Sequence, residues 1–245
     1  MLAAAVVVAL ATPSAAIDTI ETWAAGEADV EFYLGFDGAG LPGVEQTLSG
    51  AMVLGWGLAD RFSTFVATGI QADGYLTRAE TELDFGIFGT PLDTDHVDLD
   101  LLLDLRASGP QMSEASVVPA VELNLDREPD LGSYGLFLRG AAEISSHEHD
   151  DGRVERHVDL GIVGGAYYTV SPGHQILAKY GATVHERAPG HARFETGAVS
   201  VGYNAMLTDY LELITATSLE FAHEDRDASV GFVAGVIATF PSTID

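Results

Sequence analysis

Apolar and acidic residues alternate along the stretch from Glu80 to Asp126, in three runs separated by turns. In the second run, which follows the turn at residues 89–94, five apolar residues fill every second position from Val97 to Leu105. Carboxylates fill most of the positions between them. A helix, with about 3.6 residues per turn, would spread these carboxylates around its axis, whereas a strand keeps odd and even positions on opposite faces. The stretch therefore predicts three β-strands, each with one apolar and one acidic face.

The same two-residue period continues on both sides of this stretch and predicts about twelve strands in all. Tight turns at residues 58–61, 171–173 and 207–210 join some of these strands. One face of each strand is apolar, and the other is acidic or made of small residues such as Gly, Ala and Ser. This pattern is typical of an all-β, antiparallel, up-and-down transmembrane β-barrel with an acidic lumen.

Two soluble architectures are the alternatives. A β-sandwich turns its polar faces to water, and such faces are bulky and mixed in sign, unlike the small and acidic faces of this chain. A soluble barrel that binds an apolar ligand needs its apolar faces inside. Cell fractionation separates both from a membrane barrel, because only the membrane barrel requires detergent.

Aromatic residues collect near one set of the predicted turns. Trp and Tyr favour the membrane–water interface, where they form girdles around a barrel. One girdle is predicted to contain Trp56, Phe62, Tyr134, Tyr168, Tyr203 and Phe240. The opposite girdle is smaller, with Phe36 and Phe221 as its best members. If the N-terminus is periplasmic, the larger girdle marks the periplasmic interface.

The first residues resemble an export signal. Residues 1–16 form a short apolar run that ends in Ser-Ala-Ala, a site of the kind that signal peptidase cuts, although no Lys or Arg precedes the run. We therefore expect a signal peptide at 1–16, a short periplasmic segment at 17–26, the barrel at 27–241 and a tail at 242–245. The alternative for the first run is a buried apolar helix. The expected location is the bacterial outer membrane, with the N-terminus in the periplasm.

Composition excludes several classes of function. The formal net charge is −26 over 245 residues, so the chain has no basic footprint for nucleic acid and no general attraction to anionic lipid. Hydrophobic residues make up 47% of the chain, which is too many for an acidic disordered protein. There is no cysteine, so the sheet alone must hold the fold. The expected partners are outer-membrane lipid and small solutes or cations.

Two tight turns resemble those of small outer-membrane barrels. Residues 57–62, Gly-Leu-Ala-Asp-Arg-Phe, and residues 206–211, Met-Leu-Thr-Asp-Tyr-Leu, follow the order Leu, then Thr or Ala, then Asp near an aromatic residue. In this respect the chain is similar to the phenol-degradation MetA-type outer-membrane proteins, and the resemblance implies a channel or transporter. The end of the chain departs from the usual aromatic last residue, because five residues follow Phe240.

Neither a metal site nor an enzyme is expected. His147 and His149 lie on one side of a polar loop, but the histidines lack a fixed tetrahedral spacing. Ser145, His157 and Glu143 lie on adjacent predicted strands and would suit a hydrolase, yet no nucleophile motif surrounds the serine. No cofactor is expected.

The acidic faces are the candidate functional surface. If they line a lumen, their fixed negative charge attracts cations and repels anions. The expected pore-lining residues are Glu80, Glu82, Asp84, Asp98, Asp100, Asp104, Arg106, Glu122, Arg139, Glu143, Asp159, Lys179 and Glu212. We therefore predict a passive outer-membrane pore or transporter that favours cations or small cationic or polar solutes. The alternative is a non-conducting structural or adhesion-type barrel with a plugged, salt-bridged interior.

A tight hairpin at residues 89–94 would set like charges opposite one another. It would place Asp84 opposite Asp100 and Glu80 opposite Asp104, and such pairs repel across two strands.

Few bases are available to compensate these acids. The candidates are Arg106, Arg139 and Lys179. We expect Arg106 to pair with Glu114. This pairing would leave other carboxylates unpaired and able to act on a permeant ion, namely Asp98, Asp100 and Glu122.

Overall fold

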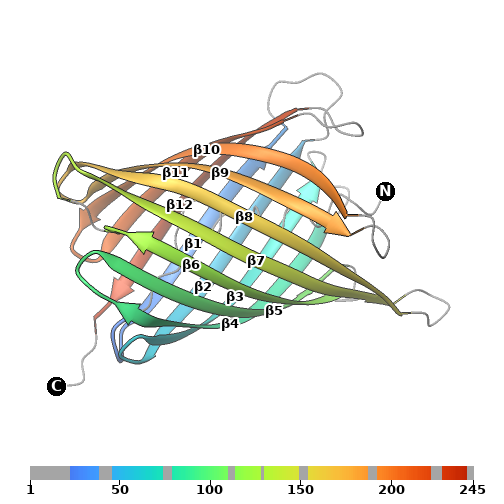
Figure 1. Ribbon diagram of the computed structural model, residues 1–245, viewed down its shortest axis with the longest axis horizontal. Helices are drawn as coiled ribbons and strands as arrows, with labels where there is room; N and C mark the ends of the chain where they lie inside the picture. The colour runs from blue at the N-terminus through green and yellow to red at the C-terminus, as the bar shows by residue number, and fades with distance from the viewer. Residues whose placement is uncertain are drawn as a thin grey trace.

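Twelve antiparallel strands close into one barrel in the computed structural model of the protein (Figure 1). The structure describes residues 23–38, 46–73, 79–109, 114–127, 130–148, 154–186, 192–221 and 228–241. The strands are β1 (Ala28–Asp37), β2 (Thr47–Ala59), β3 (Phe62–Asp73), β4 (Ala79–Asp93), β5 (Val97–Ser108), β6 (Glu114–Leu125), β7 (Tyr134–Glu148), β8 (Val154–Ser171), β9 (His174–Glu186), β10 (Ala192–Thr208), β11 (Leu211–Glu220) and β12 (Ser229–Phe240). Each strand pairs with its neighbours in sequence, and β1 pairs with β12 to complete the circle. The predicted all-β, up-and-down barrel is confirmed.

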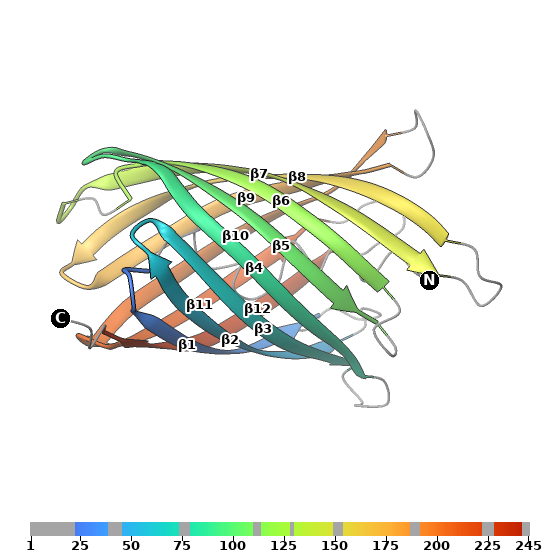
Figure 2. The same cartoon turned by 90° about the horizontal axis from the view of Figure 1, so that it is seen from below.

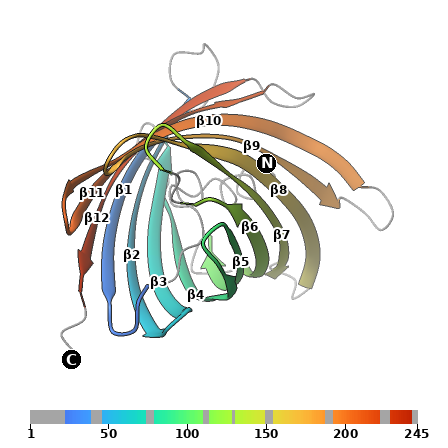
Figure 3. The ribbon, with the colours of Figure 1, turned by 60° about the vertical axis from the view of Figure 1, so that its left-hand side comes forward.

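The wall is made only of strands, which are tilted and curve around the barrel (Figures 2 and 3). The described residues contain no helix of the length and apolarity needed to cross a membrane.

Alternation divides each strand between an outer and an inner face. On β5, Leu101 and Leu103 point outward and are 48% and 40% exposed, whereas Asp100 and Asp104 point inward and are 0% and 2% exposed. Many apolar residues predicted for the other strands, such as Leu138, Leu160 and Phe232, are likewise exposed, and others, such as Leu54 and Val66, have intermediate exposure. Within the described strands the apolar faces therefore lie outside, as a membrane barrel requires and an apolar-lined soluble barrel does not.

The predicted aromatic girdle forms a belt at one end of the barrel. Its members are all exposed, at 39–69% of their surface: Trp56, Phe62, Tyr134, Tyr168, Tyr203 and Phe240. The first residue of β1, Ala28, faces Trp56 of β2 on one side and Phe240 of β12 on the other. The belt therefore encircles the end where β1 begins and β12 finishes, which we call the short-turn end.

Tight connections define this end. Two-residue turns join β2 to β3, β8 to β9 and β10 to β11. In the turn between β8 and β9, Gly173 has φ 71°, and a Cβ at this position would lie 2.9 Å from the Cβ of Met206. Only glycine adopts this conformation and fits this space without strain.

The predicted register of the hairpin between β4 and β5 is wrong. Asp84 lies opposite Arg106, not Asp100, and Gly86 lies opposite Asp104. The reason is that β4 continues through Pro91 to Asp93, past a bulge between Gly89 and Leu92, so the chain turns at residues 94–96. A later turn shifts every cross-strand pair of the hairpin.

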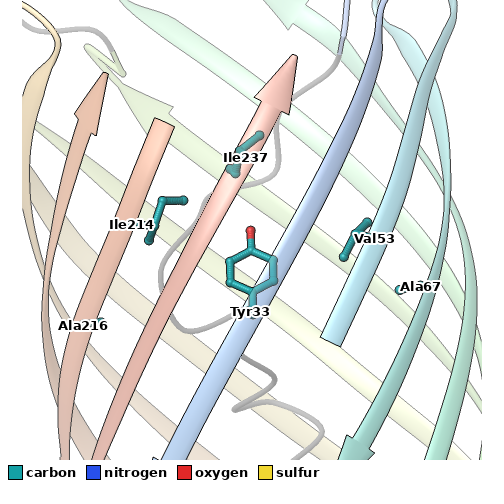
Figure 4. Packing of buried hydrophobic residues seen from close by; sticks show 6 residues of the cluster. All are labelled: Tyr33, Val53, Ala67, Ile214, Ala216 and Ile237. Atoms are coloured by element: carbon teal, nitrogen blue, oxygen red, sulfur yellow. The ribbon is translucent and has the colours of Figure 1, made fainter. Parts of the chain in front are cut away.

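The interior also holds an apolar cluster, on the side of the barrel built from β11, β12 and β1–β3 (Figure 4). Tyr33 lies at its centre and is 1% exposed. Its ring packs over Gly235, where an added Cβ would lie 2.3 Å from ring atom Cδ1. The other buried members are Val53, Ala67, Ile214, Ala216 and Ile237. The interior therefore mixes acidic and apolar side chains, even along one strand, since Glu31 and Tyr33 are both buried on β1.

Candidate functional site

The thirteen predicted lining residues differ in their burial. Those buried in the interior are Asp100, Asp104, Glu122, Glu143 and Asp159. Those with intermediate exposure are Glu82, Asp84, Asp98, Arg106, Arg139, Lys179 and Glu212, and Glu80 is exposed. The predicted lining residues whose ion pairs are described gather in two groups around β4–β8.

The first group lies toward the short-turn end, and in it two arginines neutralise two buried carboxylates. Arg139 on β7 faces Glu122 on β6, and its Nε donates to Glu122 Oε2 at 2.6 Å. Arg127, just after β6, binds Asp100 through its guanidinium, and its Nε lies 3.9 Å from Asp98 Oδ2. Each buried carboxylate of this group thus has an arginine partner.

Neutral side chains complete this network. Asn124 Nδ2 donates to Asp100 Oδ2 and Glu122 Oε1, each at 3.0 Å. Tyr167 Oη donates to Asn124 Oδ1 at 2.7 Å, and Thr90 Oγ1 donates to Asp100 Oδ1 at 2.6 Å. A buried polar network of this kind, with its members hydrogen bonded, is rigid. We call Asp100, Glu122, Asn124, Arg127 and Arg139 the neutralised network, and Asp98 flanks it.

The expectation that Asp98, Asp100 and Glu122 are unpaired is therefore wrong. The pattern of strands gave no reason to place Arg127 inside, because this residue follows the last alternating position of β6. Its side chain is nevertheless only 15% exposed. One signal could have pointed to Arg127: the inward carboxylates on β5 require a nearby base.

The second group is centred on Arg106 of β5 and lies farther from the short-turn end than the first. The Nε of Arg106 is 2.6 Å from Asp104 Oδ2, and 3.9 Å from both Asp84 Oδ1 and Glu82 Oε1. The register sets Arg106 opposite Ser116 and Glu114 opposite Ser108, so the two are diagonal neighbours, and their predicted pair stays a prediction.

Two further carboxylates extend this group. Glu143 on β7 lies directly opposite Asp159 on β8, and like charges in this position repel. Both side chains are buried. We call Glu82, Asp84, Asp104, Glu143 and Asp159 the acidic cluster.

Four oxygens of the acidic cluster have no hydrogen-bond partner among the described residues. They are Glu82 Oε1, Asp84 Oδ1, Asp104 Oδ1 and Glu143 Oε2. A buried carboxylate oxygen without a donor is costly, and the cost falls when a cation or water approaches it. The acidic cluster is therefore the part of the described interior best suited to attract a positive charge.

The first described residues fold against the inner wall at the short-turn end. The backbone N–H of Trp23 donates to Ser63 Oγ at 2.9 Å, and its indole N–H donates to Asp29. The indole meets Phe88 edge to face, with ring centroids 5.0 Å apart. It lies over Gly55, where an added Cβ would be 2.0 Å from a ring carbon. The sequence pattern gave no sign of this contact, because Trp23 precedes the first alternating strand.

The metal site and the hydrolase trio are the other two candidates considered from the sequence. No three His, Asp or Glu side chains among the described residues are placed to hold a metal ion. His149 and the side chain of His147 lie outside the described part, as do residues 1–22 and 242–245. Ser145 faces His157 across β7 and β8, two positions from Glu143, and the absence of an enzymatic role stays a prediction.

No family model and no curated protein matches the chain. The resemblance to the MetA-type family therefore stays a prediction.

Solved structures match the fold at low sequence identity. The NanC porin gives a TM-score of 0.65 at 10% identity, over 85% of this chain and 98% of the porin. The COG4313 outer membrane channel from Pseudomonas putida F1 gives 0.66 at 14% identity, over 90% of this chain and 97% of the channel. The translocator domain of autotransporter NalP from Neisseria meningitidis gives a TM-score of 0.55 at 11% identity, over 95% of this chain and 94% of that domain.

At these identities the comparisons concern the fold alone. The chain forms a closed twelve-stranded barrel of the bacterial outer-membrane type, with its apolar faces outside. This class supports an outer-membrane location and contact with lipid. Because the matches include porins, a channel and a translocator domain, the fold is compatible with a passive pore and does not by itself select one.

Proposed function

We propose that the protein is a passive outer-membrane pore that favours cations or small cationic solutes. The observation that carries the proposal is the acidic cluster. Three of its carboxylates, those of Asp104, Asp84 and Glu82, share the guanidinium of Arg106, and four of its oxygens lack a hydrogen-bond donor among the described residues. Fixed negative charge in a narrow, poorly solvated tube raises the local cation concentration and excludes anions.

In this proposal the two charged groups have different roles. The neutralised network holds the strands β5–β8 together near the short-turn end, because its carboxylates are already paired with Arg127 and Arg139. The acidic cluster selects the permeant charge. The remaining predicted lining residues, including Glu80, Lys179 and Glu212, contribute to the potential along the path.

Ion selectivity of designed variants tests this assignment. Glu82→Gln combined with Asp84→Asn removes two negative charges from the acidic cluster with little change in shape. Asp60→Asn combined with Asp209→Asn removes the same charge from exposed turns and is the matched control. We expect the first variant to lose much of its cation preference in planar bilayers, and the control to keep it. An unchanged preference in the first variant would overturn the role of the acidic cluster.

A second candidate is the non-conducting barrel with a filled interior. It is favoured by the complete burial of Asp100, Glu122 and Ile214, each 0% exposed, and of Tyr33 at 1%. Protein that inserts into planar bilayers and passes no current would support this candidate over the pore.

A further inference from the structure

A groove in the outer surface of the barrel lies around Gly89, near the short-turn end. The register aligns Phe62 of β3, Gly89 of β4 and Leu101 of β5 in one row across the wall. Phe62 and Leu101 project outward and are 42% and 48% exposed, whereas Gly89 between them has no side chain. The result is a cavity of about 510 Å³ with mainly apolar walls, which also include Ile87 and Leu103.

The bulge in β4 deepens this groove. Thr90 turns inward to bind Asp100, and Pro91 has no N–H to donate. The ladder between β4 and β5 is therefore interrupted between Gly89 and Leu92. Regular pairing is therefore lost at this level, and the ring of Phe62 borders Gly89, with its Cδ2 3.5 Å from where a Cβ would lie.

A single exposed guanidinium lies at the edge of the groove. Arg61, in the turn between β2 and β3, also lines the cavity, and its side chain is 55% exposed. Its Nε is 3.2 Å from Asp93 Oδ2, an ion pair that holds the side chain at this position. A guanidinium has five N–H donors in a planar fork that matches phosphate oxygens, so it can bind a second anion.

The position of Arg61 matches the depth of lipid headgroups. Its neighbour in sequence, Phe62, belongs to the aromatic girdle, as does Trp56 on the adjoining strand β2. Such girdles lie at the level of the headgroups, and the apolar belt beyond them contacts acyl chains. From this point the groove runs into the apolar belt along Leu101 and Leu103.

We propose that this groove binds one phospholipid of the leaflet at the short-turn end, with the phosphate on Arg61 and an acyl chain over Gly89. Charge complementarity supports this occupant, because a cation at the edge of an apolar groove is unusual in a chain of net charge −26. The volume lies within the ~300–1,000 Å³ typical of small-molecule sites. The proposal is independent of ion conduction through the lumen.

Native mass spectrometry of the detergent-purified barrel, titrated with phosphatidylglycerol, tests the site. Arg61→Gln removes the phosphate partner. Gly89→Leu adds a side chain to the groove and keeps the guanidinium, although its Cβ would lie 3.2 Å from the backbone O of Arg61 and the turn must shift slightly. We expect Arg61→Gln to lower the fraction of singly lipid-bound protein about tenfold, the effect of losing roughly one charge-assisted contact. Gly89→Leu should lower it as well, because its side chain occupies the place of the acyl chain. Heat-modifiable gel mobility establishes that each variant is folded.

Two variants elsewhere on the outer wall are the controls. Gly164→Leu adds the same side chain to β8, where an added Cβ meets only ordinary contacts, and Arg156→Gln removes an exposed arginine from the far end of β8. Both should retain lipid as the wild type does. Equal lipid binding by all variants would overturn the site. Loss of lipid in Arg61→Gln but not in Gly89→Leu would also overturn it, because it would indicate a headgroup contact without an acyl chain in the groove. A lipid-free dimer abolished by Gly89→Leu would instead assign the groove to a second copy of the chain.

Discussion

Arg106 is the residue on which the charge balance of the acidic cluster depends. It is 11% exposed and lies within 4 Å of Asp104, Asp84 and Glu82. Buried ions lose much of their hydration, and their mutual attraction offsets this loss only while both signs are present. Without the guanidinium, three carboxylates would face one another between β4 and β5.

We therefore expect Arg106→Gln to lower the free energy of unfolding by about 3 to 5 kcal/mol. Arg61→Gln, which breaks an exposed pair with Asp93, should cost less than about 1 kcal/mol. Adding Asp104→Asn to Arg106→Gln should recover part of the loss, since it removes one of the uncompensated charges. Urea unfolding in lipid vesicles, followed by heat-modifiable mobility, measures all three. Equal losses for Arg106→Gln and Arg61→Gln would contradict the central role of Arg106.

At the scale of elements, the start of the chain completes the inner wall. Trp23 and Ala24 occupy the space that two glycines leave on β2. An added Cβ at Gly55 would meet the ring of Trp23, and one at Gly57 would meet Ala24 O at 1.9 Å. The indole also binds Asp29. These contacts hold the segment before β1 against β2, β3 and β4, inside the short-turn end.

Gly55→Leu should displace Trp23 from this position. In a Trp56→Phe background, Trp23 is the single tryptophan, so its fluorescence reports the site alone. We expect red-shifted emission and greater access to a soluble quencher, because the indole moves from a packed to a hydrated environment. Gly140→Leu is the control, because an added Cβ there has open space. Unchanged emission in Gly55→Leu would show that the packing of Trp23 does not depend on Gly55.

The strands of this fold could be predicted from the sequence. Which residues face each other across neighbouring strands was harder to predict. Alternation has a period of two, so runs such as Val97 to Leu105 reveal a strand and its faces without knowledge of its neighbours. Register depends on where the chain turns and on bulges, and the bulge after Gly89 shifted the pairs of β4 and β5. Arg127 and Trp23 lie just outside a strand, so the two-residue period could not predict that their side chains enter the interior.

At the scale of the whole molecule, three features lie at the same end of the barrel. They are the short turns, the larger aromatic girdle, and the start of β1 beside the end of β12. Short turns are typical of the periplasmic side of bacterial outer-membrane barrels. We therefore propose that this end faces the periplasm. The longer connections, including those around Gln46 and Phe221, would then face the outside.

The absence of cysteine makes this orientation testable by single substitutions. Asp60→Cys places a thiol in a short turn, and Gln46→Cys places one at the opposite end, both at exposed positions. With a membrane-impermeant maleimide we expect labelling of intact cells for Gln46→Cys alone, and labelling of both variants after lysis. The reverse pattern in intact cells would invert the orientation.

The central claim is that a net acidic interior passes cations in preference to anions. The most direct measurement is the reversal potential of the wild-type protein in a planar bilayer under a potassium chloride gradient. We expect a potential of the sign for cation preference at low salt, decreasing toward zero near 1 M, where the Debye length shrinks to about 3 Å and screens the carboxylates. A reversal potential of the opposite sign, which reports anion preference, would contradict the account.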